Sequence, residues 1–201
     1  MASETDIANM ALAHLGNSNV IMALDEKSNE ARACLLFYEQ CRDEVLTAFP
    51  WTFANQQEAL GLVAVMPTTE WAYSYRYPSD VIQLIRILSG TLRVDTHGSR
   101  VPYKLGRDST GMLIYTDQPN AVVEYTYRVT ETASFTPHFV KALALRLAAD
   151  IAPLVTGGDQ FKLGQLALAR YAEAIGAAQS NAANEEIQDL PPDDDFITVR
   201  N

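Results

Sequence analysis

The sequence predicts an α+β fold, in which a helical bundle carries a β-rich antiparallel insertion between its second and third long helices. Apolar residues recur with helical spacing near both ends of the 201-residue chain, and they alternate with period two in its middle. A polar stretch with paired prolines and clustered acids ends the chain. We therefore assign residues 1–50 and 134–184 to the helical bundle, 51–133 to the insertion and 185–201 to a flexible acidic C-terminal tail.

The first helix is predicted at the start of the chain. Ser3 or Thr5 can cap its beginning, and Gly16 marks its end. His14 falls on the inward stripe, where we expect a partly buried structural histidine because no second metal-binding residue lies at a matching offset. The stripe comprises Ile7, Met10, Ala11, His14 and Leu15.

The second helix is predicted over residues 28–49. Ser28 is suited to the N-cap, and Pro50 ends the helix because the residue before a proline avoids helical angles. Cys34 and Cys41 lie about 10 Å apart along its axis, too far for a disulfide, and are expected to be small core residues. The inward stripe comprises Ala31, Cys34, Leu35, Tyr38, Cys41, Arg42, Val45, Leu46 and Phe49.

The middle of the chain is predicted to form a small antiparallel sheet or sandwich. The stretches "WAYSYRY" at 71–77 and "AVVEYTYRV" at 121–129 alternate strictly between two faces, which is typical of strands. Two apolar stretches, "VIQLIRIL" at 81–88 and "GMLIY" at 111–115, are further strand candidates. Proline, glycine, asparagine and aspartate cluster between these stretches and predict turns.

Two more helices are predicted after the strands. Thr136 is an N-cap followed by a proline at the first helical position, and residues 139–154 are apolar nearly all round, which predicts a central, buried helix. Pro153 should kink or end this helix, on which Arg146 and Asp150 are spaced to pair. The last helix, over 160–183, has one face formed by Gly164, Ala167, Leu168, Tyr171, Ile175 and Ala178.

The charge balance disfavours some partners. The chain holds 25 acidic against 15 basic residues, and half of its net charge of −10 lies in residues 181–201. This balance disfavours the wrapping of phosphate backbones and suits a surface past which DNA slides without sticking. We expect no membrane span, since Arg146 interrupts the longest apolar run, and no signal peptide, since "MASETDIAN" lacks basic and hydrophobic regions.

No catalytic, metal-binding or cofactor-binding site is predicted. Arg42, Asp43 and Glu44 are the sharpest enzyme candidate, but neighbouring helical residues point about 100° apart and cannot converge on one substrate atom. We expect instead a buried or half-buried arginine ion pair beside a solvated acidic edge. The three histidines show no zinc spacing, and neither a GxxxxGK[ST] loop nor a GxSxG elbow is present.

Three segments carry a resemblance to a known family. They read "DIANMALAHLG" at 6–16, "EARACLLFYEQCRDEVLTAFPWTFA" at 30–54 and "FTPHFVKALALRLAADIAPLVTG" at 135–157. Together, in this order and spacing, they resemble the head-to-tail adaptor of short-tailed phages, also called tail tubular protein A. The family's tyrosine-rich strand usually leads into L-P-x-D, and here Tyr77 precedes the proline in place of the leucine.

The resemblance implies a structural protein of the virion tail that is assembled in the host cytoplasm. It implies a ring of twelve copies, each expected to be a monomer before assembly, that docks under the portal protein, closes the packaged head and connects it to the tail nozzle protein. Double-stranded DNA would pass through without specific binding during ejection, and no membrane is involved. Five residues match the family as a structural seam, not as catalysts: Arg42, Asp43, Pro50, Trp51 and Phe53.

The acidic tail is expected to contact the portal or a neighbouring subunit. A segment that folds on contact gains a large contact area with modest stability of the free monomer. The residues assigned to this contact are Ile187, Leu190, Pro191, Pro192, Phe196, Ile197 and Val199.

Two other functions stay open from the sequence. The first is a tail-associated peptidoglycan hydrolase that uses a carboxylate pair, although 25 acids offer too many pairs to select one. The second is a DNA-binding regulator, which the negative charge disfavours.

Overall fold

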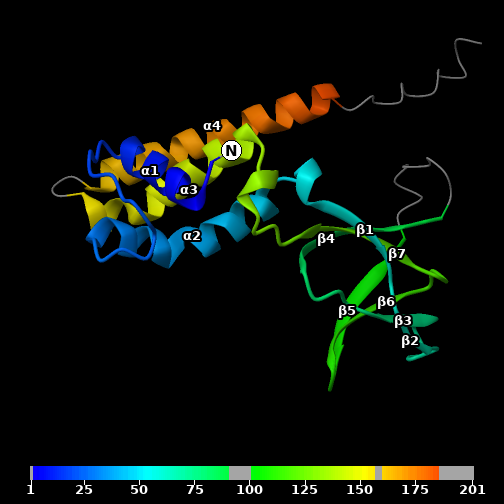
Figure 1. The fold of residues 1–201 in the computed structure, drawn as a ribbon. Helices are drawn as coiled ribbons and strands as arrows, with labels where there is room; N and C mark the ends of the chain where they lie inside the picture. Colours follow the sequence, from blue (N-terminus) through cyan, green and yellow to red (C-terminus); the bar gives the residue numbers. More distant parts are fainter. Residues whose placement is uncertain (1, 91–100, 157–159, 186–201) are drawn as a thin grey trace, which may run out of the picture.

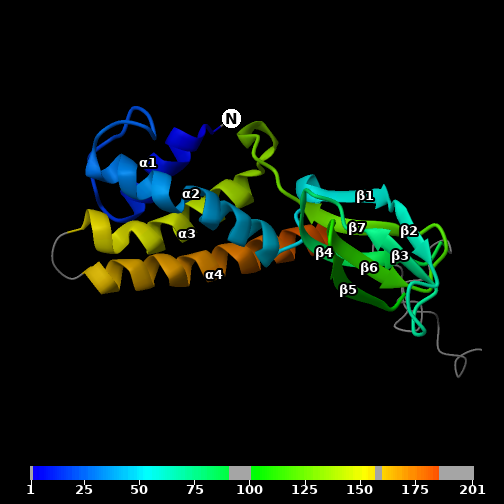
Figure 2. The ribbon, with the colours of Figure 1, turned by 90° about the horizontal axis from the view of Figure 1, so that it is seen from below.

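The computed structural model describes residues 2–90, 101–156 and 160–185, and within them the chain forms four α-helices and seven β-strands. The strands belong to two antiparallel sheets, so the predicted α+β class is confirmed. Figures 1 and 2 show the helices side by side and the sheets beyond one end of them. The helices are α1 (Glu4–His14), α2 (Asn29–Ala48), α3 (Pro137–Val155) and α4 (Gln160–Glu185).

Local capping sets where the helices begin. The Ser3 hydroxyl accepts from the Asp6 backbone N–H while the Asp6 carboxylate accepts from the Ser3 N–H, which forms a capping box at α1. Ser28 caps α2 and Thr136 caps α3, where Pro137 fills the first position. These helix starts confirm the predicted ones.

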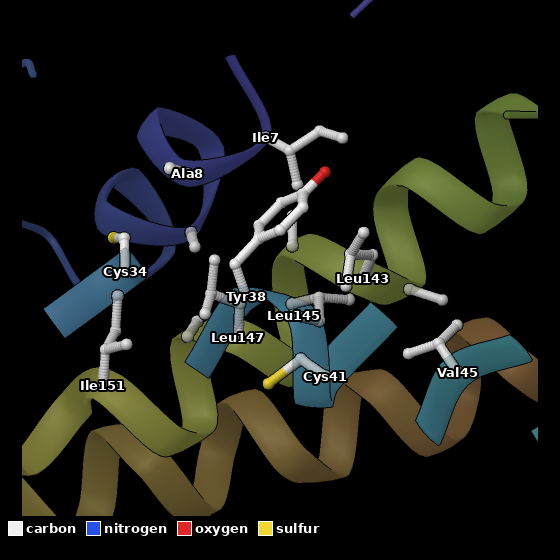
Figure 3. Packing of buried hydrophobic residues seen from close by; sticks show 14 of the residues in the cluster. Ile7, Ala8, Cys34, Tyr38, Cys41, Val45, Leu143, Leu145, Leu147 and Ile151 are labelled. Carbon is white, nitrogen blue, oxygen red and sulfur yellow. The ribbon is translucent and has the colours of Figure 1, made fainter. Parts of the chain in front are cut away.

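Helix α3 is the centre of the helical part, since it packs against each of the other three helices. Its Phe139, Leu143, Leu147 and Ile151 are fully buried. Figure 3 shows the Tyr38 ring of α2 between α1 and α3, with its hydroxyl beside Ile7. This packing explains why α3 is apolar nearly all round.

Three residues predicted to face inward are exposed. Met10 on α1, Leu35 on α2 and Leu168 on α4 are each close to half exposed. On α1 the buried stripe includes Ala8 and Leu12, so the buried face is rotated away from Met10. The periodicity was correct, but the centre of each stripe depends on which neighbouring helix covers it.

Helices α3 and α4 approach closely at Gly164. A Cβ atom at this position would lie 3.2 Å from the Ala149 carbonyl oxygen and 3.3 Å from the Ala152 Cβ. Small residues on both helices therefore let the backbones come together. Farther along α4 the buried residues are also alanines, namely Ala167, Ala174 and Ala178.

The first sheet has three strands in the order β1-β7-β4. They are β1 (Asn55–Ala59), β7 (Val122–Tyr127) and β4 (Val81–Leu88), with register shifts between β4 and β7. The sequence predicted β4 and β7, whereas β1 reads "NQQEA" and shows no strand pattern. Its pairing with β7 over all five residues makes it a strand.

The second sheet has four strands in the order β2-β3-β6-β5. They are β2 (Leu62–Val65), β3 (Tyr73–Arg76), β6 (Gly111–Thr116) and β5 (Tyr103–Asp108). Strands β3 and β6 were predicted, and β2 and β5, at the two borders of the sheet, were not.

A second apolar core lies within the strand region. Tyr75 and Ile114 of one sheet and Val123 and Tyr125 of the other are buried in it. Tyr127 packs against both this core and the helical core, which joins the two parts. Across the described residues, no helix is long and apolar enough to cross a membrane.

Candidate functional site at the junction of helices and sheets

Five aromatic rings meet where the chain passes between helices and sheets, and we call them the aromatic junction. The chain leaves α2 through Phe49, Trp51 and Phe53, and it returns to α3 through Phe135 and Phe139. Neighbouring ring centroids lie between 4.5 and 6.1 Å apart, and several pairs are T-shaped. Such pairs are favourable beyond the area they bury. These ring contacts therefore hold the segment that leaves α2 against the segment that returns to α3.

Trp51 is the central ring of the aromatic junction. It is 4% exposed, and its indole Nε1–H donates to the backbone carbonyl of Val45 at 2.8 Å. Its ring contacts Phe49 at 5.1 Å, Phe139 at 5.2 Å and Phe53 at 6.1 Å. The side chain thus satisfies its one donor and locks the segment after α2 against the last turns of that helix.

Pro50 acts on the backbone and is itself exposed. Helix α2 ends at Ala48, and Phe49 is extended with φ −153° and ψ 143°. This conformation is the one that a following proline favours. The helix therefore stops where the chain must turn into the aromatic junction.

Arg42 and Asp43 form an ion pair that reaches the strand region. The Arg42 guanidinium is nearly buried, and its Nε and Nη2 donate to Asp43 Oδ1 at 3.1 and 2.9 Å. The other oxygen of Asp43 lies 3.0 Å from Nε of Arg128, just after β7. Asp43 therefore bridges α2 and the exit from the first sheet. The predicted buried arginine pair is confirmed, and its acid is the adjacent residue.

Glu44 belongs to a separate set of contacts, which we call the α2–α3 ion network. Arg146 of α3 donates to Glu44 at 2.8 Å and to Asp150 at 2.7 Å, as the spacing of Arg146 and Asp150 predicted. The Cys41 thiol donates to the second oxygen of Asp150 at 3.3 Å. The expectation that Glu44 lies on a solvated edge is therefore only half met, because it is partly buried against Arg146.

Burial makes the thiols of Cys34 and Cys41 unreactive. Burial raises the pKa of Cys34 to about 11. Burial and then the nearby Asp150 carboxylate raise the pKa of Cys41 further. Because the thiolate is the reactive form, both cysteines behave as core residues, as the sequence predicted.

The histidines do not form a metal site in the described residues. His14 is half buried, and burial followed by the charges of Arg170 and Lys141 lowers its pKa. His138 is exposed beside Asn181, and His97 lies outside the described residues. In the part of the chain that the structure describes, no three His, Cys, Asp or Glu side chains are grouped to hold a metal ion.

Two carboxylates converge on one phenol at the first sheet. The Tyr125 hydroxyl lies 3.0 Å from Glu58 Oε2 and 3.3 Å from Asp80 Oδ1. Glu58 and Asp80 are both exposed, whereas the Tyr125 ring is buried. Burial and hydrogen bonding to these carboxylates raise the pKa of Tyr125, so the phenol stays a donor. Glu58 and Asp80 therefore form a carboxylate pair on which a hydrolase hypothesis can rest.

Arg76 and Asp108 form a bidentate ion pair at the surface. Arg76 donates to both oxygens of Asp108 at 3.0 Å, and Thr110 and Gly111 backbone N–H groups donate to the same carboxylate at 2.8 Å. Hydrogen bonding from Arg76 and then from Thr110 lowers the pKa of Asp108 strongly. The pair holds the β5–β6 turn against β3.

We expect the Asp108→Asn variant to be less stable than the wild type at neutral pH and to lose this disadvantage in acid. The folded-state pKa of Asp108 is depressed, so its contribution is present above the ordinary value of 3.8 and is lost as the pH falls through the folded pKa. Urea midpoints of both chains, measured from pH 7 to below 3.8, report this difference. A gap that stays constant into acid would contradict the assignment.

The sequence missed part of this site. The site is completed by Arg128, Phe135 and Phe139. All three lie between the end of β7 and the first turn of α3, far from Trp51 in the chain. The spacing of Phe135 and Phe139 at the start of α3 was a usable signal. The tail residues assigned to partner contact, Ile187 to Val199, lie outside the described residues.

Comparison with known proteins does not identify the chain. No protein-family model matches it, and no curated protein sequence is significantly similar to it.

Proposed function

We propose that this chain is a structural head-to-tail adaptor of a short-tailed phage virion. It docks under the portal as a ring, closes the packaged head and connects it to the tail nozzle. The observation that carries the proposal is the aromatic junction, because the P-W-x-F-A motif of the resemblance supplies two of its five rings, Trp51 and Phe53. A motif that fastens two parts of a scaffold suits a building block.

Within this proposal, the finer arrangement is a helical bundle, residues 1–50 and 134–184, that carries the strands of 51–133 as an insertion. All seven described strands lie between α2 and α3 in the chain, which supports this division. The bundle makes the portal and inter-subunit contacts, and the strands point toward the nozzle.

Exposed apolar residues on both parts suit such contacts. The segment between α1 and α2 is held to α1 by Asn9, whose side chain exchanges two 3.0 Å hydrogen bonds with the Ile21 backbone. Val20 and Met22, which flank Ile21, are exposed. Met22 is 85% exposed, and Met66 at the end of β2 is 77% exposed. In the proposed ring these side chains are candidates for contacts with protein partners.

The charge of the chain suits a passage for DNA. A net charge of −10 per copy, repeated around a ring, repels the phosphate backbone and lets it move without specific binding.

Mixing the purified chain with portal protein tests the proposal. We expect a monomer by light scattering alone and twelvefold rings under the portal by negative-stain microscopy. A mixture in which the portal stays bare at saturating adaptor would overturn the proposal.

Removal of residues 186–201 should leave the monomer folded and weaken assembly on the portal. The segment lies beyond Glu185, the last described residue of α4, and each lost apolar contact lowers affinity for the partner. Circular dichroism reports folding, and sedimentation with portal reports assembly. A chain in which a Gly-Ser segment of equal length replaces 186–201 is the matched control. Unfolding of the truncated chain would contradict the tail assignment.

A tail-associated peptidoglycan hydrolase is the second candidate, and the pair of Glu58 and Asp80 favours it. Clearing of a peptidoglycan suspension that vanishes in Glu58→Gln or Asp80→Asn, but persists in the exposed control Glu131→Gln, would support the hydrolase. Full retention in both variants would remove this pair from consideration.

A further inference from the structure

Strand β5 forms one border of the four-stranded sheet. In the described residues it pairs with β6 alone, without a register shift from Tyr103 to Asp108. Among the described residues no strand lies beside its outer edge, whose backbone N–H and C=O groups can therefore pair with another strand. Tyr103 and Leu105 are 37% and 44% exposed along this edge. An edge of this kind can accept one more strand.

The side chains of β5 restrict which strand can pair with it. Tyr103, Leu105 and Arg107 share one face of the strand because side chains alternate with period two, and Lys104 lies on the other. Lys104 makes a loose 3.9 Å contact with Glu70, and both side chains are exposed. Basic residues repel a second β5 edge, so they discourage pairing between identical strands. A strand with an acid followed by apolar residues at period two complements them.

The chain carries such a sequence after α4. Residues 193–199 read "DDDFITV" and lie outside the described residues. Asp195, Ile197 and Val199 recur at period two, and isoleucine and valine favour strands.

One antiparallel alignment matches every residue of the shared face. It places Asp195 opposite Arg107, Ile197 opposite Leu105 and Val199 opposite Tyr103, which gives one charge pair and two apolar pairs. Residues directly opposite each other on antiparallel strands have adjacent Cβ atoms and interact. A slip by one residue moves all three tail residues to the other face and brings Asp194, Phe196 and Thr198 opposite Arg107, Leu105 and Tyr103 instead. The proposed register is favoured because it makes two apolar pairs, whereas the slipped one makes a single apolar pair and sets a threonine against Tyr103.

We propose that residues 195–199 of one copy add as an antiparallel strand to β5 of a second copy of this chain. Figure 1 shows the end of α4 at the top of the molecule and β5 at its bottom, so a neighbouring copy is the natural acceptor. The inference rests on the proposed function for the ring that places copies side by side. It goes further by naming the strand, the acceptor edge and the register.

Disulfide trapping between full-length chains tests this strand addition. One chain carries Leu105→Cys and the other carries Ile197→Cys, and the native Cys34 and Cys41 are buried. Under mild oxidation we expect a mixed disulfide dimer on a non-reducing gel. Lys104→Cys replaces Leu105→Cys in the matched control, which should give no such dimer because position 104 faces the other side. A yield equal to that of the control would overturn the inference.

The charge pair provides an independent test of the register. Adding Arg107→Asp to the Leu105→Cys chain should reduce the yield to the control level, and Asp195→Arg in the other chain should restore it. An unchanged yield with Arg107→Asp, or no restoration, would overturn the register. A further variant carries both Leu105→Cys and Ile197→Cys in one chain. If the disulfide forms only within that chain and never between two chains, the proposal that a second copy is the acceptor is overturned.

Trapping is measured on concentrated protein alone and again with portal, where rings are scored by microscopy. Rings without the disulfide dimer would overturn strand addition and leave the adaptor function standing. The dimer without rings would support strand addition and overturn the adaptor function. Thermal melting of every variant confirms that the cysteine and charge changes leave the chain folded.

Discussion

Replacement of Trp51 by alanine should lower the free energy of unfolding by about 3–5 kcal/mol, the usual cost of removing a buried tryptophan. The side chain is 4% exposed, it packs against three phenylalanine rings, and its Nε1–H satisfies the Val45 carbonyl. The cavity left behind lies between the segment that leaves α2 and the segment that enters α3. Neither segment can move in to fill the cavity without shifting the end of its helix. Urea denaturation followed by circular dichroism measures the change.

Two control variants separate the causes of this loss. Trp51→Phe keeps an aromatic ring and removes the donor, so it should cost less than Trp51→Ala, with about 1 kcal/mol attributable to the hydrogen bond. Trp71→Ala removes the other tryptophan, which is half buried and whose Nε1 has no hydrogen-bond partner in the described residues, and it should cost clearly less. Equal losses at Trp51 and Trp71, or an unchanged midpoint for Trp51→Ala, would contradict the role of the aromatic junction.

The Arg146→Ala variant should lose about 2–3 kcal/mol of stability. Fully buried ion pairs lose about 3–5 kcal/mol when one partner is removed, and solvent screening reduces that value here. The side chains of Arg146, Asp150 and Glu44 are 19, 23 and 40% exposed. The variant leaves two carboxylates facing each other between α2 and α3 without a cation. The change is measured by urea denaturation at neutral pH.

Neutralising the acids as well should recover much of this loss. A chain with Arg146→Met, Glu44→Gln and Asp150→Asn has no unpaired charge in the α2–α3 ion network, and uncharged replacements of buried ion pairs are often close to neutral. Lys141→Met, an exposed position on the same helix, is the matched control and should change stability by no more than about 0.5 kcal/mol. A triple variant as unstable as Arg146→Ala would show that packing of the arginine stem is what matters.

Helix boundaries could be predicted because their causes are local. Ser3, Ser28 and Thr136 each cap the helix that follows within three residues, and Pro50 acts on the residue before it. The inward side of each helix was less predictable. Met10 was placed inside and is exposed, because the position of α3 decides which part of a broad apolar stripe is covered.

The border strands could not be predicted from their own residues. Strand β1 consists of four polar residues and Ala59, all of them exposed, and its strand conformation follows from its partner β7. Strand β5 interrupts its pattern with Gly106, where a Cβ atom would collide with the Tyr115 ring of β6. The conformation of β1 is imposed by a partner distant in sequence and that of β5 by the adjacent strand of its hairpin, and both override local propensity.

Only part of the candidate site could be predicted from the sequence. Trp51 and Phe53 follow directly from the aromatic run after Pro50, and Arg42 from its place on an apolar stripe. Arg128 and Phe139 could not be assigned to the same site, because their contacts join segments about 85 residues apart in the chain. Asp43 was expected to face elsewhere, yet an arginine side chain is long enough to curl back to its neighbour.

The placement of all described strands between α2 and α3 has a consequence for biosynthesis. On the ribosome, α1 and α2 emerge before the segment that will cover their apolar faces has been translated, a delay on the order of ten seconds at ordinary elongation rates. During that interval the nascent helices expose to solvent the side chains of Ile7, Leu12 and Val45, which are buried in the finished fold, and apolar surface of this kind is prone to aggregation. Only the arrival of α3 allows the helical core to close around them.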